Sequence, residues 1–182
     1  MNTTTSAKQD SQPRVWPRHI YEVFKQVGIE QIAYVPDAGH TQLIKDCEAD
    51  NAMSVVSLTS EEEGVAMLAG GWLGGKKGAL LMQSSGVGNC INMLSVVQEC
   101  RFPLLMLVTM RGEWGEFNPW QLPMGQGTPQ ALESAGVVVQ RVDHADEVRD
   151  VVHAAAMMTF SSNRPIAVLL SQRLVGFKDW SK

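Results

Sequence analysis

The stretch of residues 60–89 constrains the fold of this chain more than any other part of it. Three consecutive acids, Glu61, Glu62 and Glu63, open a run of small and apolar residues that predicts a helix over 61–73. An apolar run at 79–82 then predicts a buried strand, which leads into the glycine-rich turn Gly86-Val87-Gly88. Helix, strand and glycine turn in this order are typical of open α/β folds, which bind ligands at the carboxyl ends of parallel strands. An acid of this helix can therefore face a ligand site.

The same alternation of helix and strand runs through the rest of the chain. Apolar periodicity and stop signals predict helices at 19–27, 43–50, 61–73, 89–99, 128–135 and 145–160, and apolar runs predict strands at 31–35, 53–58, 79–82, 104–109, 137–140 and 165–170. Because these strands are nearly continuous apolar runs, they indicate a parallel sheet that is covered on both faces. We predict a single-domain α/β three-layer sandwich with a six-stranded parallel sheet.

Length and composition limit the classes of function. A chain of 182 residues is long enough for one domain and too short for two of ordinary size. We expect residues 1–13, which are polar and lack the apolar run of a signal peptide, to be a disordered tail before a domain at 14–182. No run approaches about 18 apolar residues, so we expect a cytoplasmic protein without a membrane span. The formal net charge of −4 argues against nucleic acid as a partner.

The cysteines and glycines match no familiar cofactor motif. Cys47, Cys90 and Cys100 are an odd set without CxxC spacing, so we expect buried, reduced thiols and no metal site. The glycines that imitate a P-loop lie between the predicted helix at 61–73 and the predicted strand at 79–82. A P-loop is excluded because its glycines must follow a strand and precede a helix. Gly86-Val87-Gly88 lacks the third glycine of a dinucleotide fingerprint.

Two groups of residues are candidates for chemistry. Ser60 and Glu63 have the spacing of a capping box, which leaves Glu62 or Glu61 to face a crevice. His40 follows a predicted strand end, where α/β enzymes place reactive groups.

A long segment, 111–127, follows the fourth predicted strand and is rich in Gly, Pro and aromatic residues. Trp114, Phe117 and Trp120 in this segment are either simple packing or a lid that excludes water from a site.

These motifs, in this order, resemble the thiamine-diphosphate-dependent sulfopyruvate and phosphonopyruvate decarboxylases. The resemblance covers most of 21–170, and its motifs are 61–73, 78–89, Arg101-Phe102-Pro103-Leu104-Leu105, and Arg111-Gly112-Glu113 followed by Pro123-Met124-Gly125. It is greatest to the alpha subunits, which carry the pyrimidine-binding domain on a separate polypeptide. The resemblance implies that fold and a decarboxylase activity.

By this resemblance, Glu62 is the catalytic acid, which hydrogen-bonds N1′ of the cofactor's aminopyrimidine. His40 is a second catalytic candidate on account of its place after a strand end. The resemblance also implies binding residues. Those expected to bind thiamine diphosphate are Pro36, Asp37, Glu62, Ser84, Ser85, Gly86 and Asn89. For the substrate we expect contacts from Ala38, Gly39 and Arg111, and Arg111 is chosen because an Arg fork suits sulfonate, phosphonate and carboxylate oxygens.

The chain lacks the Gly-Asp-Gly motif with a downstream Asn that holds the diphosphate and Mg²⁺ in this family. We therefore expect a hetero-oligomer in which thiamine diphosphate and Mg²⁺ are held mainly by a beta subunit. The expected reaction converts a small 2-oxo acid, with 3-sulfopyruvate or 3-phosphonopyruvate as first choice, to an aldehyde and carbon dioxide. Half of a carboligase similar to acetolactate synthase, or a non-catalytic α/β binding protein of the same fold, remain the alternatives.

Overall fold

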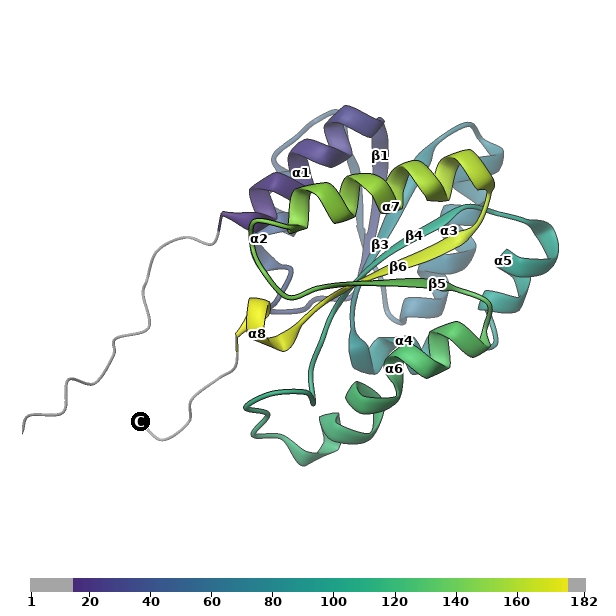
Figure 1. Cartoon of the computed structure of the whole chain (residues 1–182). Helices are drawn as coiled ribbons and strands as arrows, with labels where there is room; N and C mark the ends of the chain where they lie inside the picture. The colour runs from purple at the N-terminus through teal and green to yellow at the C-terminus, as the bar shows by residue number, and fades with distance from the viewer. Residues whose placement is uncertain (1–14, 177–182) are drawn as a thin grey trace, which may run out of the picture.

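The computed structural model describes residues 15–176 (Figure 1). The strands are β1 (Ile29–Tyr34), β2 (Ser54–Ser57), β3 (Lys77–Gln83), β4 (Leu104–Thr109), β5 (Val138–Val142) and β6 (Pro165–Leu170). The helices are α1 (Trp16–Val27), α2 (Thr41–Glu48), α3 (Glu61–Leu73), α4 (Ser84–Cys90), α5 (Leu94–Cys100), α6 (Leu122–Ser134), α7 (Val148–Ser162) and α8 (Gln172–Val175), and a 3₁₀ turn, η1 (Pro119–Gln121), precedes α6.

The strands form one six-stranded sheet in the order β2-β1-β3-β4-β6-β5, and every pairing is parallel. Helices α1, α2 and α7 pack on one face of the sheet, and α3 to α6 pack on the other. Figure 1 shows α1 and α7 on one side of the strands and α4 and α6 on the other. The predicted three-layer sandwich is therefore confirmed.

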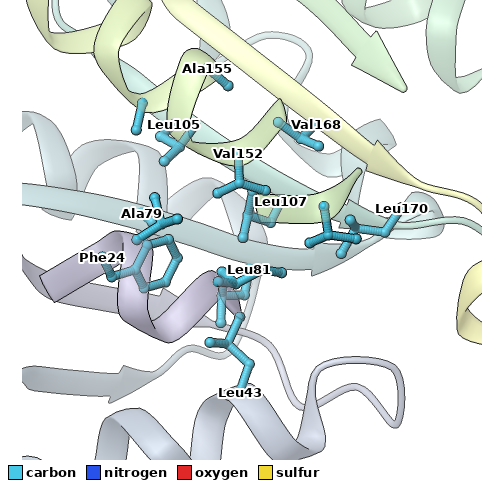
Figure 2. Close-up of a cluster of buried hydrophobic side chains, with 14 of the residues drawn as sticks. Phe24, Leu43, Ala79, Leu81, Leu105, Leu107, Val152, Ala155, Val168 and Leu170 are labelled. Carbon is cyan, nitrogen blue, oxygen red and sulfur yellow. The ribbon is translucent and has the colours of Figure 1, made fainter. Parts of the chain in front are cut away.

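The central strands are buried on both faces because their alternate side chains enter two separate apolar layers. On β3, Leu81 faces the layer under α1 and α7, while Leu80 faces the layer under α3 and α4. Figure 2 shows the first layer, in which Phe24 of α1 lies near Ala79 of β3, and Val152 of α7 lies near Leu107 of β4. All of these side chains are 0% exposed.

Helix α3 lies unusually close to the sheet because two glycines remove side chains from the contact. A Cβ at Gly64 would lie 2.6 Å from Cδ1 of Leu80, and a Cβ at Gly78 would lie 2.4 Å from Cδ2 of Leu68. Such distances are too short for real Cβ contacts, so these positions hold α3 against β3 at close range. The first turn of α3 is thereby placed at the carboxyl edge of the sheet.

Four expectations about local structure were wrong. The glycine-rich segment after β3 is helical rather than a turn, and residues 89–99 are split between α4 and α5. Helix α6 begins at Leu122, earlier than predicted, because Pro123 occupies its first turn, where a missing N–H costs nothing. Cys47 and Cys90 are buried, but Cys100 is exposed.

The predicted tail, 1–13, lies outside the described residues. Within 15–176, no helix is both long and apolar enough to cross a bilayer.

Candidate functional site

The candidate residues gather where the chain leaves the sheet in opposite directions. After β1 the chain turns to α2 on one face, and after the neighbouring strand β3 it turns to α4 on the other face. Such a switch point opens a crevice at the carboxyl ends of parallel strands and is where open α/β folds bind ligands.

Asp37 joins the ends of three adjacent strands. Its Oδ2 accepts hydrogen bonds from the Thr109 hydroxyl at 2.6 Å and from the Gly39 backbone N–H at 3.0 Å. Its Oδ1 accepts from Nε2 of Gln83 at 3.0 Å. Because both carboxylate oxygens are engaged within the chain, Asp37 holds the ends of β1, β3 and β4 together.

His40 is the N-cap residue of α2 and lies in the core. Its side chain is 0% exposed, and its Nε2 donates to the Leu107 carbonyl oxygen at 3.0 Å. Burial lowers the pKa of His40, so the neutral ring is favoured. Its Nδ1 has no hydrogen-bond partner among residues 15–176. A ring without solvent access is poorly placed to exchange protons with a substrate, and this geometry favours a structural role.

The three acids at the start of α3 have three different environments. Glu61 is buried, at 7% exposure, whereas Glu62 and Glu63 are exposed. The predicted capping box is not formed, because Oε2 of Glu63 accepts from the backbone N–H of Thr59 at 2.9 Å instead of that of Ser60, and the Ser60 side chain makes no capping bond. Glu63 reaches one residue past the N-cap.

Glu61 lies between α3 and α4. Nδ2 of Asn89 donates to its Oε2 at 2.8 Å. A Cβ at Gly86 would lie 2.1 Å from Oε1 of Glu61, so only glycine leaves room for this carboxylate. Glu61 thus fills the space beside Gly86 and Asn89, two of the four α4 residues that the family resemblance assigns to the cofactor.

The first residues of α4 are small, and some of them are exposed to solvent. Ser84 is buried, and its Oγ accepts from the Arg111 backbone N–H at 3.1 Å. Ser85 is exposed and donates to Oε1 of Gln83 at 3.0 Å. Around Gly88, the nearest atom to an added Cβ would be Sδ of Met124, at 3.4 Å. The exposed residues of α4, which are Ser85, Gly88 and Asn89, are therefore all small or short.

Arg111 is already paired within the chain. Its Nε and Nη2 donate to Glu116 Oε2 and Oε1 at 2.7 and 2.6 Å, and the Glu116 side chain is 1% exposed. Nε2 of the buried Gln172 also donates to Glu116, at 2.9 Å. Because Glu116 takes up the charge of Arg111 and raises its pKa further, the geometry favours a role for Arg111 in holding the loop.

The loop after β4 is tied to the body of the protein. Oε1 of Gln172 accepts from the backbone N–H groups of Glu113 and Trp114 at 2.9 and 3.0 Å. The loop nevertheless presents aromatic rings to solvent, with Phe117 48% and Trp120 88% exposed. The structure shows an anchored segment with an exposed aromatic surface.

Pro36 and Ala38 are exposed on the turn after β1, whereas Gly39 is buried. Added to Gly39, a Cβ would lie 2.7 Å from Cγ2 of Thr109. Beside this turn is an open cavity of about 370 Å³, lined by Tyr34, Pro36, Asp37, Ala38, Thr41 and Lys45 among others.

The structure brings Asp37, Ser84, Gly86, Asn89 and the acids of α3 to one edge of the sheet. Sequence reasoning missed Thr109, Gln83 and Gln172 as partners in this network. Thr109 and Gln83 carry one available signal, since each is a polar residue at the end of an apolar strand. Gln172 carries none, because its contacts join segments far apart in sequence.

Glu62 presents an exposed carboxylate on the first turn of α3, and α3 packs against α4. An exposed acid can hydrogen-bond a ring nitrogen of a flat heterocycle. The donor set does not fit a metal ion held by this chain alone. Within 15–176 no group of three or more His, Cys, Asp or Glu side chains is arranged to hold one.

Residues 17–132 match the family described as thiamine pyrophosphate enzyme, N-terminal TPP binding domain. The sulfopyruvate decarboxylase alpha subunit of Methanococcus maripaludis is 32% identical over 152 residues, which are 83% of this chain and 91% of that protein. The alpha subunit from Methanothermobacter thermautotrophicus is 33% identical over 152 residues, 83% of this chain and 92% of that protein.

Two longer proteins also match. A phosphonopyruvate decarboxylase of Streptomyces viridochromogenes is 32% identical over 152 residues, which are 82% of this chain and 38% of that protein. A solved structure of 2-oxoglutarate:ferredoxin oxidoreductase from Magnetococcus marinus shares the fold, with a TM-score of 0.71 and 16% identity over 88% of this chain and 29% of that one.

Proposed function

The chain belongs to the thiamine pyrophosphate enzymes through their N-terminal TPP binding domain, and on that premise we propose that it is the pyrimidine-binding subunit of a two-subunit 2-oxo acid decarboxylase. The observation that carries the proposal is that this chain spans 91% of a relative that is named an alpha subunit. We propose 3-sulfopyruvate or 3-phosphonopyruvate as substrate, the compounds for which the relatives are named.

Thiamine diphosphate, when bound, supplies the nucleophilic carbon and the electron sink that decarboxylation of a 2-oxo acid requires. In this chain Glu62 would hold a proton at the pyrimidine nitrogen, which is the task of a positioned acid. Asp37, Gln83 and Thr109 would keep the strand ends beside it in place. The exposed Gly88, which has no side chain, would let the ring approach the backbone of α4.

The exposed face of α3 supports the proposal that a partner subunit binds this chain. Glu62, Ala66 and Gly70 are spaced at four residues, so they lie on one side of the helix, and all are exposed. Leu73, which follows them at the end of the helix, is 75% exposed. A helix that is apolar on nearly all sides is normally buried. We propose that the partner covers this face, which would enclose Glu62 between the subunits.

The partner would hold the diphosphate and Mg²⁺ through oxygen ligands, which Mg²⁺ requires. It would also supply much of the positive charge for the substrate's sulfonate or phosphonate, because Arg111 is already paired with Glu116. We further propose that the complex works in the cytoplasm, since Cys47, Cys90 and Cys100 are free thiols.

The test is to produce this chain together with a second polypeptide that carries the Gly-Asp-Gly motif. The pair, with thiamine diphosphate and Mg²⁺, should release carbon dioxide and an aldehyde from 3-sulfopyruvate or 3-phosphonopyruvate. A carboligase would instead yield a longer hydroxy-ketone product. Titration calorimetry of this chain alone should show no tight binding of thiamine diphosphate, and sub-micromolar binding would contradict the division of labour.

A further inference from the structure

We propose that Glu61 is a positioning residue for this site: its buried carboxylate clamps α4 to the first turn of α3 and thereby fixes the direction in which Glu62 projects. The kinetic part of this inference rests on the proposed function. The structural part concerns this chain alone.

The contacts of Glu61 point into the chain. Its Oε2 accepts the 2.8 Å hydrogen bond from Nδ2 of Asn89, and its Oε1 lies against the Cα of Gly86. Helices α3 and α4 pack against each other on the same face of the sheet. Glu61 therefore joins two helices whose starts both lie at the site.

A buried acid is a costly way to join two helices. Removing a carboxylate from water is unfavourable unless hydrogen bonds replace its solvation, and within 15–176 a single hydrogen bond to this side chain is found. Its place in the first turn of α3 offsets part of the cost, because the helix dipole favours acids there. Local rules of stability are most often broken at functional sites, and the residue next to Glu61 is Glu62.

The same geometry argues against Glu61 as the acid that meets the cofactor. With 7% exposure and both oxygens turned toward α4, its carboxylate is shielded from a ring that approaches from outside. Glu62, one residue later and about 100° further round the helix, is exposed. Glu61 acts through Glu62 and not on the ring.

The experiment separates size, hydrogen bonding and charge. In the two-subunit enzyme, Glu61→Ala should lower kcat by about 10- to 100-fold with KM within about twofold, because the acid is misplaced and substrate binding is not. Gly86→Ala should do the same, since its methyl group would displace the Glu61 carboxylate. Glu61→Gln keeps an oxygen for Asn89 and should restore kcat to within about threefold of the original enzyme. Glu63→Gln, the same change in the same turn, is the matched control.

A second readout needs neither partner nor cofactor. In the isolated chain, Glu61→Ala should speed amide hydrogen exchange across α4 and the first two turns of α3 by about tenfold, whereas Glu61→Gln should not.

The proposal is overturned if Glu61→Gln loses as much kcat as Glu62→Gln, since the carboxylic acid itself would then be required. It is also overturned if Glu61→Ala leaves both kcat and exchange unchanged. If the original pair shows no decarboxylation at all, the proposed function fails, and the exchange experiment still decides whether the clamp exists.

Discussion

The guanidinium of Arg111 and the carboxylate of Glu116 form a two-point ion pair at the base of the loop after β4, with Nε to Oε2 at 2.7 Å and Nη2 to Oε1 at 2.6 Å. The backbone N–H groups of Gly112 and Asn118 donate to the same carboxylate at 3.2 and 3.0 Å. The carboxylate of Glu116 therefore holds the Arg111 side chain and the loop backbone together.

This pair predicts a dependence of stability on pH. The hydrogen bond from Arg111, supported by the backbone N–H groups, lowers the pKa of Glu116 to about 2 against the opposing effect of burial. Because the pKa is lower in the folded state, the stabilisation is present above the unfolded value and is lost as pH falls toward the folded value. The difference in unfolding free energy between the original chain and Glu116→Gln should shrink by about 2 kcal/mol between about pH 6 and pH 3.

Urea unfolding over that pH range measures this difference. The exposed Glu147→Gln is the control and should show no such trend. A difference that stays constant with pH would show that the ion pair does not stabilise the fold.

The catalytic assignment of Glu62 predicts a loss of turnover without a loss of structure. Glu62→Gln should lower kcat by about 10²- to 10⁴-fold, because an amide cannot hold or release the proton. Its side chain is exposed in this chain, so circular dichroism should not change, and partner affinity should be kept because Gln has nearly the same size and shape as Glu. Glu63→Gln should retain activity. Full activity of Glu62→Gln with saturating cofactor would remove the assignment.

The face of α3 predicts a variant that folds but does not assemble. An added Cβ at Gly70 would meet no atom within 4 Å, so Gly70→Leu should leave the isolated chain at least as stable, with a gain of up to about 1 kcal/mol from helix propensity. If a partner packs on this face, its affinity should fall by at least about tenfold. Ala154→Leu, an exposed site on α7 across the sheet, is the matched control. Unchanged partner affinity would place the interface elsewhere.

The hydrogen bonds of the buried Gln172 predict that this side chain stabilises the loop after β4. Gln172→Leu would leave the N–H groups of Glu113 and Trp114 without their acceptor and remove a donor to Glu116. The expected cost is about 2–4 kcal/mol in unfolding free energy, with faster hydrogen exchange over 112–118. Exposed Gln130→Leu should have little effect on either quantity. A loop that exchanges equally fast in both variants would argue against the anchoring role.

Much of the fold could be predicted because the apolar pattern itself determines it. The ranges predicted for α3, β4 and β6 agree with the structure, since long apolar runs and a helix start leave few alternatives. The segment of α4 could not be predicted in the same way. Its glycines have poor helix propensity, and packing against α3 overrides that preference.

The sequence allowed the site to be placed at one edge of the sheet, but the hydrogen bonds between its residues could not be predicted. Thr109 and Asp37 are 72 positions apart, and Asn89 and Glu61 are 28 apart. No local pattern encodes such pairs. The sequence also left open which of Glu61 and Glu62 is buried, because the choice depends on where α4 lies.

The strand order carries a consequence for the growing chain during synthesis. Strand β5 is made before β6, yet in the described sheet β6 is its sole neighbour, and β6 also pairs with β4. Until the ribosome has released residues 165–170, β5 therefore lacks a template and β4 has an open edge, and exposed strand edges invite pairing with other chains. When β6 is added, it pairs with both β4 and β5 and so covers both exposed edges. A nascent chain stalled before this point would depend on chaperones, and early termination there should give aggregates rather than a smaller soluble protein.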